Sequence, residues 1–458
     1  MNKEETSNPL SSFSTFSIDH REQQESSSAV SDTKRRSSGS AVVFGTEISA
    51  LCFCIPLNWV LKPNDGHELN VKNSDLSTVF LLLNYMIGSG IVVQAYVFSQ
   101  SGIIVCIFEY IIISIMNYTG VNLLVRCAEE TKVFDYSNLA ETILGPWGSI
   151  LVDVSIVVGA AGSLLSYILI IGSVLTEVVM KCSEWYCNVI FLTTIPVTLF
   201  TVPLCLLRNF GHLAVASYIS ITVISASVLL VIIGGPIVNE NNRDHNYRMG
   251  SFIGAIKTIG DIVFALGYIT ATFHTYNSMK NRTIKNFNQV SLNTIIIGAI
   301  MCFFTGLIGY ISFGSNTKSN IIENFDGYLG GFFKIALVIH LVLYIPGDFV
   351  IMRSAIIKLC QWQLSELSDI IFISLSLFCI CIITIIALLL QIYLSSTDSL
   401  AIVVDITGGI AGSMLYFIIP ALCGFSLFKN NLELYWKSLI LLLFGTTLII
   451  LVIISSGM

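Results

Sequence analysis

The chain has 458 residues, of which 54% are hydrophobic and only 11% are charged, and its mean hydropathy is +0.80. Soluble domains hold about 25% charged residues, so this composition excludes that class and predicts an all-α polytopic protein embedded in the lipid bilayer. The formal net charge of −6 argues against a nucleic-acid partner.

Residues 1–74 are predicted to form a disordered cytosolic tail, because the first 40 positions are rich in Ser, Gln and Glu and nearly free of large aliphatic side chains. Within this tail, residues 41–61 are apolar but are interrupted by Glu47 and Pro56, and a charge inside a span opposes insertion. We interpret 41–61 as an interfacial or docked segment, although a full crossing stays open. The tail is a place where a regulatory protein could bind.

The first long apolar run extends from Leu76 to Gln100, carries no charge and is long enough to cross a bilayer as a helix. Gly88 and Gly90 lie near its middle, where they weaken the helix, and Asn84 adds a polar group one turn earlier. Freed backbone inside a membrane is tolerated only where it is buried in protein or lines a cavity. We therefore predict a broken helix beside a cavity, as in secondary transporters. The alternative is close helix packing through small residues.

Ten further apolar runs follow, so eleven transmembrane helices are predicted, with the two termini on opposite sides of the membrane. Lys and Arg are concentrated in the loops on the same side as the N-terminus, which predicts a cytosolic N-terminus. Residues 75–428 form a predicted core of ten spans, and residues 429–458 hold the eleventh span and the C-terminus. The later runs lie at 103–124, 149–179, 189–207, 214–236, 252–275, 292–313, 330–354, 369–394, 401–427 and 436–454.

Four motifs occur in an order that is similar to one known family. They are Asn84–Ile91 with Tyr96–Gly102, Pro203–Gly211, Tyr276–Thr283 with Gln289–Ser291, and Gly309–Gly314 with Lys318–Ile321. Together they resemble the amino acid/auxin permease family, and within it the sodium-coupled neutral amino acid transporters. The resemblance covers roughly residues 76–354 and rests on the order of the motifs, since no single one is decisive. It implies a LeuT-like fold, in which spans one to five and six to ten are inverted repeats and span eleven is appended.

The same resemblance implies a secondary active transporter of neutral amino acids that works by alternating access as a symporter. Its substrate would bind between the discontinuous spans one and six. A half-helix that begins after the first break would point its positive end and its unpaired N–H groups at the substrate carboxylate. For the threonines of span six, bonding back to helix carbonyls is the simpler alternative. The expected substrate-binding residues are Asn84, Gly88, Ser89, Gly90, Gly267, Tyr268 and Thr270.

The coupling ion is a sodium ion or a proton, and no other cofactor is expected. In the family, sodium is held by carbonyls of span one and hydroxyls of span eight, but Val342 and Tyr344 stand where span eight should carry threonines. A tyrosine oxygen lies too far from its own backbone to replace a threonine oxygen, and hard cations need a nearly complete oxygen shell. No metal site is therefore assigned, with Asn84 as the remaining candidate if sodium is bound. We expect weak or absent sodium dependence.

Two ionisable residues of span eight, His340 and Asp348, are the candidates for proton coupling, because charged groups inside a membrane are often functional. The alternatives are a packing histidine and an ordinary ion pair between Asp348 and Arg353. Motifs of nucleotide hydrolysis, metalloproteases and nucleophile elbows do not occur, so the chain is not expected to be an enzyme. The other functional interpretations are an amino acid sensor that signals through its tail and a channel-like protein. Both the plasma membrane and an endolysosomal or vacuolar membrane stay open.

Overall fold

The computed structural model describes residues 73–179, 188–206, 214–239, 247–362, 367–394 and 396–456. Nearly all of these residues are helical, and the only β-bridge among them joins Asn73 to Met279. The tail of residues 1–72, with its predicted interfacial segment at 41–61, lies outside the described residues.

Within the described ranges, eight helices are long and apolar enough to cross a membrane, and a ninth span results if one bent pair is counted as a unit. Two shorter apolar helices, Ile190–Cys205 and Thr222–Ile237, occupy the places where the sequence predicts spans four and five. The all-α polytopic architecture is thereby confirmed. The unbroken helices are α5 (Ile103–Thr131), α7 (Pro146–Val179), α10 (Ala214–Asn239), α13 (Ile284–Phe313), α14 (Gly327–Leu359), α15 (Asp369–Tyr393) and α18 (Leu432–Ser456), with the short α6 (Tyr136–Leu144), α8 (Val189–Pro196) and α9 (Val202–Cys205) between them.

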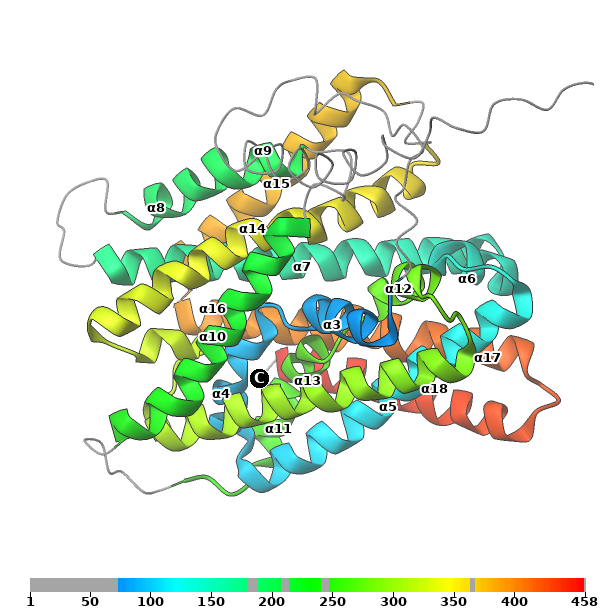
Figure 1. Ribbon diagram of the computed structural model, residues 1–458, viewed down its shortest axis with the longest axis horizontal. Helices are drawn as coiled ribbons and strands as arrows, with labels where there is room; N and C mark the ends of the chain where they lie inside the picture. The colour runs from blue at the N-terminus through cyan, green and yellow to red at the C-terminus, as the bar shows by residue number, and fades with distance from the viewer. Residues whose placement is uncertain are drawn as a thin grey trace, which may run out of the picture. The chain divides into compact units, whose positions relative to one another are not determined.

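The first span is broken, as the sequence predicts. Its two halves, α3 (Asp75–Met86) and α4 (Gly90–Ser101), meet at an angle of 62°, and Figure 1 shows them as two blue segments with different directions. Ser74 caps the start of α3 by accepting a hydrogen bond from the Ser77 N–H. The break itself leaves the polypeptide non-helical between the two halves, where glycine weakens the helix.

The sixth span is also interrupted. Its first half, α11 (Phe252–Ala265), is separated from α12 (Thr272–Ser278) by the single 3-10 turn η4 (Ile269–Ala271). Helix α11 packs against α4, and α12 packs against α3, so that the two breaks face each other. A Cβ on Gly267, within this break, would lie 2.1 Å from the Tyr416 hydroxyl oxygen, so only glycine fits beside that side chain.

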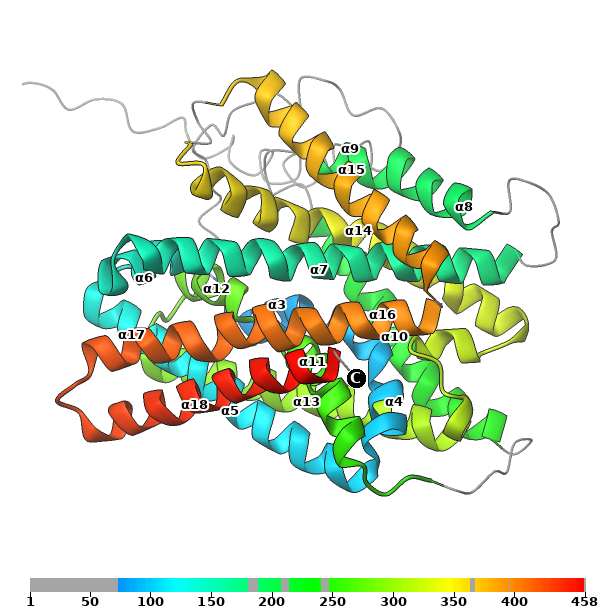
Figure 2. The ribbon, with the colours of Figure 1, turned by 180° about the vertical axis from the view of Figure 1, so that it is seen from behind.

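The tenth span contains two π-helical stretches in its glycine-rich part. It runs through α16 (Ser396–Ile406), η7 (Thr407–Gly412), η8 (Met414–Ile418) and α17 (Ile419–Leu427), and Figure 2 shows it in orange beside the red α18. A Cβ on Gly408 would lie 2.0 Å from the Gly260 carbonyl oxygen, so the glycine lets η7 approach α11 closely. This approach brings the tenth span against the broken sixth span.

Candidate functional site

A cavity lies between the two helix breaks. It has an empty volume of about 690 Å³, which includes open solvent at its mouth. Its wall is completed by α7, α14 and the π-helical part of the tenth span. The lining residues are Tyr85, Met86, Gly88, Ile156, Gly159, Ala160, Ser163, Tyr167, Phe264, Gly267, Thr270, Asp348, Ile351, Thr407, Gly408, Gly412, Leu415 and Tyr416.

The cavity is not centred on every helix that lines it. The lining residues of α7, 156–167, straddle the middle of that helix, whereas Asp348 and Ile351 lie in the second half of α14. Since α14 runs in the opposite direction to α7, its side of the cavity lies nearer to the end of the bundle that holds α6 and α12. By the Lys and Arg distribution, this is the end predicted to face the cytosol.

The start of α4 provides unpaired backbone donors at the first break. Among the described residues, the N–H groups of Ser89 and Gly90 have no backbone or side-chain acceptor, and α4 has no side-chain cap. Uncapped N–H groups and the helix dipole give such an end a partial positive charge. Gly88 lines the cavity directly before this end, and a Cβ there would lie 3.1 Å from the Tyr167 hydroxyl oxygen. The break can therefore bind an anionic group.

Asp348 supplies the opposite charge. It is the only Asp, Glu, Lys, Arg or His among the described residues that line the cavity, and its Oδ2 accepts a hydrogen bond of 2.8 Å from the Tyr167 hydroxyl. The ion pair with Arg353 that the sequence left open is not formed, because the Arg353 guanidinium donates to the Cys205 carbonyl and to Ser376 Oγ instead. A positive helix end and a carboxylate on one small cavity suit a zwitterionic ligand.

Tyr344 fills the space between α14 and the end of α3. Its hydroxyl donates hydrogen bonds to the carbonyl oxygens of Asn84, at 2.8 Å, and Tyr85, at 3.3 Å. The expectation that a tyrosine oxygen lies too far from its own backbone to replace a threonine oxygen stays a prediction, and the structure adds that the ring spans the gap between the helices, so that the hydroxyl reaches these carbonyls. It reaches them as a donor. The carbonyls that a cation would need are thus already bonded to a proton donor.

Three of the seven expected substrate-binding residues, Gly88, Gly267 and Thr270, line the cavity. Asn84 does not line the cavity, and its carbonyl oxygen accepts the hydrogen bond from the Tyr344 hydroxyl. Ser89 is buried, and its hydroxyl shares a hydrogen bond of 2.8 Å with Ser166 on α7.

The other expected residues lie elsewhere. Gly90 faces α11, where a Cβ would lie 2.7 Å from the Ala265 Cα atom, so this glycine serves helix packing. The Tyr268 hydroxyl bonds to Ser291 on α13 at 2.7 Å and points away from the cavity. Of the two coupling candidates, Asp348 lines the cavity, whereas the buried His340 packs beside Tyr344 with its ring centroid 5.5 Å away.

The contribution of α7 was missed by the sequence reasoning. Tyr167 lies between Gly88 and Asp348, and Gly159, Ala160 and Ser163 form a small-residue surface on the same wall. The available signal was the group of small residues at 159–163 within an otherwise bulky apolar run. Tyr416 on the tenth span was not predicted either, because its neighbours in the sequence are as apolar as those of Tyr167.

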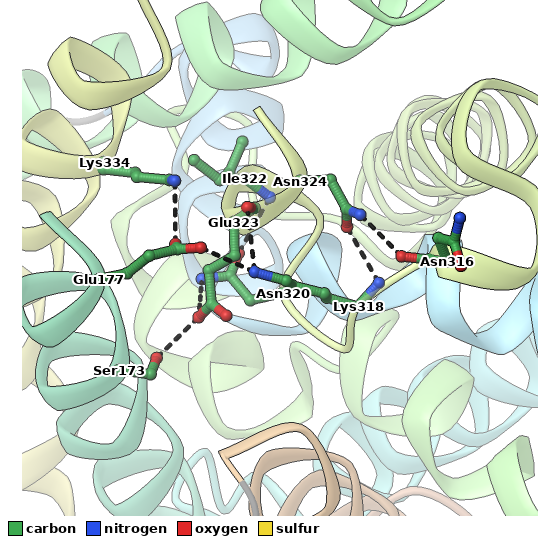
Figure 3. Close-up of polar contacts among 9 residues, drawn as sticks. All are labelled: Ser173, Glu177, Asn316, Lys318, Asn320, Ile322, Glu323, Asn324 and Lys334. Atoms are coloured by element: carbon green, nitrogen blue, oxygen red, sulfur yellow. Dashed lines mark hydrogen bonds and ion pairs between the residues drawn. The ribbon is translucent and has the colours of Figure 1, made fainter. Parts of the chain in front are cut away.

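The opposite end of the bundle carries a network of ion pairs and hydrogen bonds (Figure 3). Glu177, near the end of α7, pairs with Lys318 at 2.7 Å and with Lys334 at 2.9 Å. Lys318 belongs to the loop that joins α13 to α14, and Lys334 belongs to α14 itself. The network therefore ties this loop to both helices, and none of its residues lines the cavity.

Glu323, in the same loop, is also held by this network. Its carboxylate accepts hydrogen bonds from the Ser173 hydroxyl at 2.7 Å and from the Asn320 amide at 3.2 Å. Burial raises the pKa of Glu323 above its usual value, and the bond from Ser173 opposes this shift. The loop thus docks with its acidic group turned inward.

Comparisons with known proteins agree with this architecture. A Rattus norvegicus protein provisionally named sodium-coupled neutral amino acid transporter 11 is 25% identical over 383 residues, which cover 80% of this chain and 82% of the relative. The amino acid transporter AVT6E of Arabidopsis thaliana is 25% identical over 391 residues, covering 80% and 78%. The vacuolar amino acid transporter 2 of Saccharomyces cerevisiae is 26% identical over 282 residues, covering 59% and 58%. All are named as transporters, a non-enzymatic class, as the sequence predicts.

Solved structures show the same fold at low sequence identity. A Na⁺-coupled sialic acid symporter aligns with a TM-score of 0.52 and 13% identity over 92% of this chain and 97% of that one. A manganese transporter of Eremococcus coleocola aligns with a TM-score of 0.51 and 13% identity over 88% and 90%. The fold is LeuT-like, as the sequence resemblance implied. The family described as transmembrane amino acid transporter protein matches residues 72–458, and the chain belongs to this family.

Proposed function

We propose that the protein is a proton-coupled symporter that moves neutral amino acids across a membrane by alternating access. The observation that carries this proposal is the cavity between two helix breaks, which is lined by Gly88, directly before the uncapped start of α4, and by Asp348. These are the complementary charges for the two ends of an amino acid.

Substrate recognition follows from these charges. The carboxylate of the amino acid binds at the N–H groups of Ser89 and Gly90, next to Gly88, and its ammonium group faces Asp348. The remaining wall is apolar or small and includes Ile156, Phe264, Ile351 and Leu415, which suits an uncharged side chain. A second charged side chain on the substrate would have no partner there, and this favours neutral amino acids.

Protons rather than sodium ions drive the transport. A sodium ion needs several oxygen acceptors, but the Tyr344 hydroxyl already donates to the Asn84 and Tyr85 carbonyls. Val342 adds no oxygen at the neighbouring position of α14. The name of the rat relative refers to sodium, and that property belongs to the relative. In this protein the hydroxyl proton of Tyr344 is bonded to the carbonyl oxygens that would otherwise coordinate a cation.

Alternating access is supported by the asymmetry between the two ends of the bundle. On α14 the cavity is lined from the half nearer to α6 and α12, and the polar network around Glu177 holds the loop at the other end against α7 and α14. With a cytosolic N-terminus, this arrangement corresponds to an inward-facing state. Transport then requires that the network around Glu177 opens when the cytosolic side closes.

The membrane is either the plasma membrane or an endolysosomal or vacuolar membrane, and the yeast relative is named for the vacuole. A regulatory protein at the N-terminal tail and the sensor alternative gain no support from the described residues.

The test of the proposed function is uptake of radiolabelled neutral amino acids into proteoliposomes under separately imposed proton and sodium gradients. Uptake that follows the proton gradient without sodium supports the proposal, and uptake that requires sodium overturns the coupling.

A further inference from the structure

Three carboxyl side chains from three different helices lie close together behind the cavity. They belong to Asp261 on α11, Asp405 on α16 and Glu109 on α5, with 0%, 6% and 7% of their surface exposed. The Asp405 Oδ1 accepts a hydrogen bond of 2.9 Å from the backbone N–H of Gly260, directly before Asp261. Asp405 and Glu109 are also the groups that interact electrostatically with Asp261.

Asp261 is the most deeply buried member of this group. Among the described residues, neither of its carboxylate oxygens has a hydrogen-bond donor, and the same holds for the carboxylate oxygens of Glu109. The titratable groups that face it are Asp405 from α16 and, from α5, Glu109 and Tyr110. Lys257, one turn earlier on α11, is exposed and forms no ion pair with it.

The other helices around α11 bring no positive charge to Asp261. Helix α4 contributes the neutral Gln94, and neither Glu433 nor Lys437, the charged residues of the described part of α18, is among the groups that interact electrostatically with Asp261. A buried carboxylate without a donor or a cation is strongly disfavoured, and two neighbouring carboxyl groups cannot both be ionised at low cost. The ligand that such a pair of acids accepts is a proton.

Asp261 and Asp405, here called the acidic pair, are connected to the cavity through the helices that carry them. Phe264, one turn after Asp261, and Thr407, two residues after Asp405, both line the cavity. The side-chain amide of Gln94 donates to the Gly90 carbonyl at 2.6 Å and lies 3.4 Å from the Asp261 carbonyl oxygen. The start of α4, the break in span six and the tenth span therefore meet at this point.

We propose that Asp261, with Asp405 beside it, is the proton-binding site that couples amino acid transport to the proton gradient. This inference rests on the proposed transport function and assigns its coupling step to residues outside the cavity. Asp348 then stays available as an anion for the substrate ammonium group.

The step is an acid–base reaction that needs no further reactant. In one state the Asp261 carboxylate takes a proton from a hydronium ion that enters from one side, which gives the neutral acid and water. In the other state α11 shifts relative to α16, Asp261 gains access to the opposite side, and the proton leaves to water there. The charge on Asp261 thus opposes the packing of α11 against η7 that the structure shows, and protonation permits it.

The experiment compares Asp261→Asn with the wild type in sodium-free proteoliposomes. Counterflow exchange of a radiolabelled neutral amino acid, with no gradient, reports binding and translocation. Substrate-induced acidification of the lumen, read by an enclosed pH dye, reports proton movement. The control is Asp153→Asn, because Asp153 is a buried acid on α7 that accepts a hydrogen bond from Ser137 at 2.8 Å and lies outside the cavity.

We expect Asp261→Asn to retain counterflow within about threefold of the wild type and to lose substrate-induced acidification by more than tenfold. Asp153→Asn should retain both activities. Acidification at the wild-type rate in Asp261→Asn overturns the inference and leaves the proposed function intact. Absence of counterflow in the wild-type protein overturns the proposed function itself, so the two failures can be told apart.

A second variant keeps the test decisive if Asp261→Asn does not fold. Asp405→Asn retains an oxygen that can accept the Gly260 N–H, but it removes the neighbouring negative charge. Because that charge favours the protonated form of Asp261, proton-driven uptake in Asp405→Asn should need a lower external pH for half-maximal rate, by about one pH unit. An unchanged pH profile in a folded Asp405→Asn protein contradicts the inference.

Discussion

The hydroxyl of Tyr344 donates a hydrogen bond of 2.8 Å to the backbone carbonyl of Asn84, across the gap between α14 and α3. The carbonyl of Tyr85 lies within reach of the same hydroxyl, at 3.3 Å. A side chain from one helix thus satisfies the backbone that the break in the first span leaves without helical partners. Both the stability of the break and the choice of the coupling ion follow from this contact.

Replacement of Tyr344 by phenylalanine should destabilise the protein by about 1–3 kcal/mol, because it leaves the partly buried carbonyls of Asn84 and Tyr85 without their donor. Tyr393→Phe is the matched control, since Tyr393 is 81% exposed at the end of α15. Thermal unfolding in detergent measures the difference. Exchange of potassium for sodium at constant ionic strength should not change the wild-type melting temperature, and a marked stabilisation by sodium would contradict the assignment of the coupling ion.

Alanine at Gly88 and at Gly90 should have different effects. At Gly88 the new methyl group enters the cavity beside the Tyr167 hydroxyl, so amino acid binding should weaken by at least tenfold while the fold is retained. At Gly90 it would meet the backbone of Ala265, so the main result should be a destabilisation of about 1–3 kcal/mol.

Gly331→Ala is the control for both variants, because a Cβ at this helical position meets no atom within 4 Å. It should stabilise the protein by about 0.5–1 kcal/mol through the higher helix propensity of alanine. Equilibrium binding and thermal unfolding are measured on the same preparations. Normal binding by Gly88→Ala would show that the substrate does not approach the first break.

Asp348→Asn should weaken amino acid binding by at least tenfold, because the substrate ammonium group loses its charged partner. Tyr167→Phe should have a smaller effect, of about 0.5–1.5 kcal/mol in binding free energy, since it removes only the hydrogen bond to Asp348. Isothermal titration with the wild type as reference measures both. His340→Gln should bind normally, because His340 does not line the cavity.

The same variants separate substrate binding from proton coupling. If Asp348 or His340 carried the coupling proton, its variant would keep counterflow exchange and lose the response to an imposed pH gradient. We expect this pattern for neither residue.

Glu177→Gln should open the end of the bundle that Figure 3 shows. It removes the charged partner of Lys334, which is only 5% exposed, and leaves this lysine buried without compensation. Loss of one partner of a buried pair costs about 3–5 kcal/mol. Glu433→Gln, which breaks the exposed pair with Lys437 on α18, should leave the stability unchanged, because exposed ion pairs contribute little.

The state of this end can be followed by labelling a single cysteine, introduced at the buried Ser319 of the same loop, with a membrane-impermeant reagent. Faster labelling in the Glu177→Gln background is expected, because the loop is held by fewer contacts. Equal labelling rates in both backgrounds would show that the network does not hold this end closed.

The broken first span could be predicted from sequence because its cause is local. Gly88 and Gly90 weaken a helix wherever they occur, and the absence of charge over the run placed that weakness inside the membrane. The contribution of Tyr167 could not be predicted in this way. The polar residues of α7, such as Asp153, Ser166 and Glu177, make contacts with several other elements, so the sequence alone does not indicate which of its side chains turn toward the cavity.

The roles of Gly90 and Tyr268 depend on contacts across long sequence separations. Gly90 is fixed by the backbone of α11, and the Tyr268 hydroxyl by Ser291 on α13. Sequence motifs do not encode which way a residue at a helix break faces. The acidic pair of Asp261 and Asp405 likewise becomes visible only when α11 and the tenth span are packed together.

The coupling of amino acid movement to protons is tested most directly by the lumenal pH of proteoliposomes that contain the wild-type protein in sodium-free buffer. Addition of a neutral amino acid should acidify the lumen in a saturable manner, and the addition of sodium should not change the rate. The acidification should disappear when a protonophore collapses the pH difference. A lumenal pH that stays constant while the amino acid enters, with entry only in the presence of sodium, would contradict proton coupling.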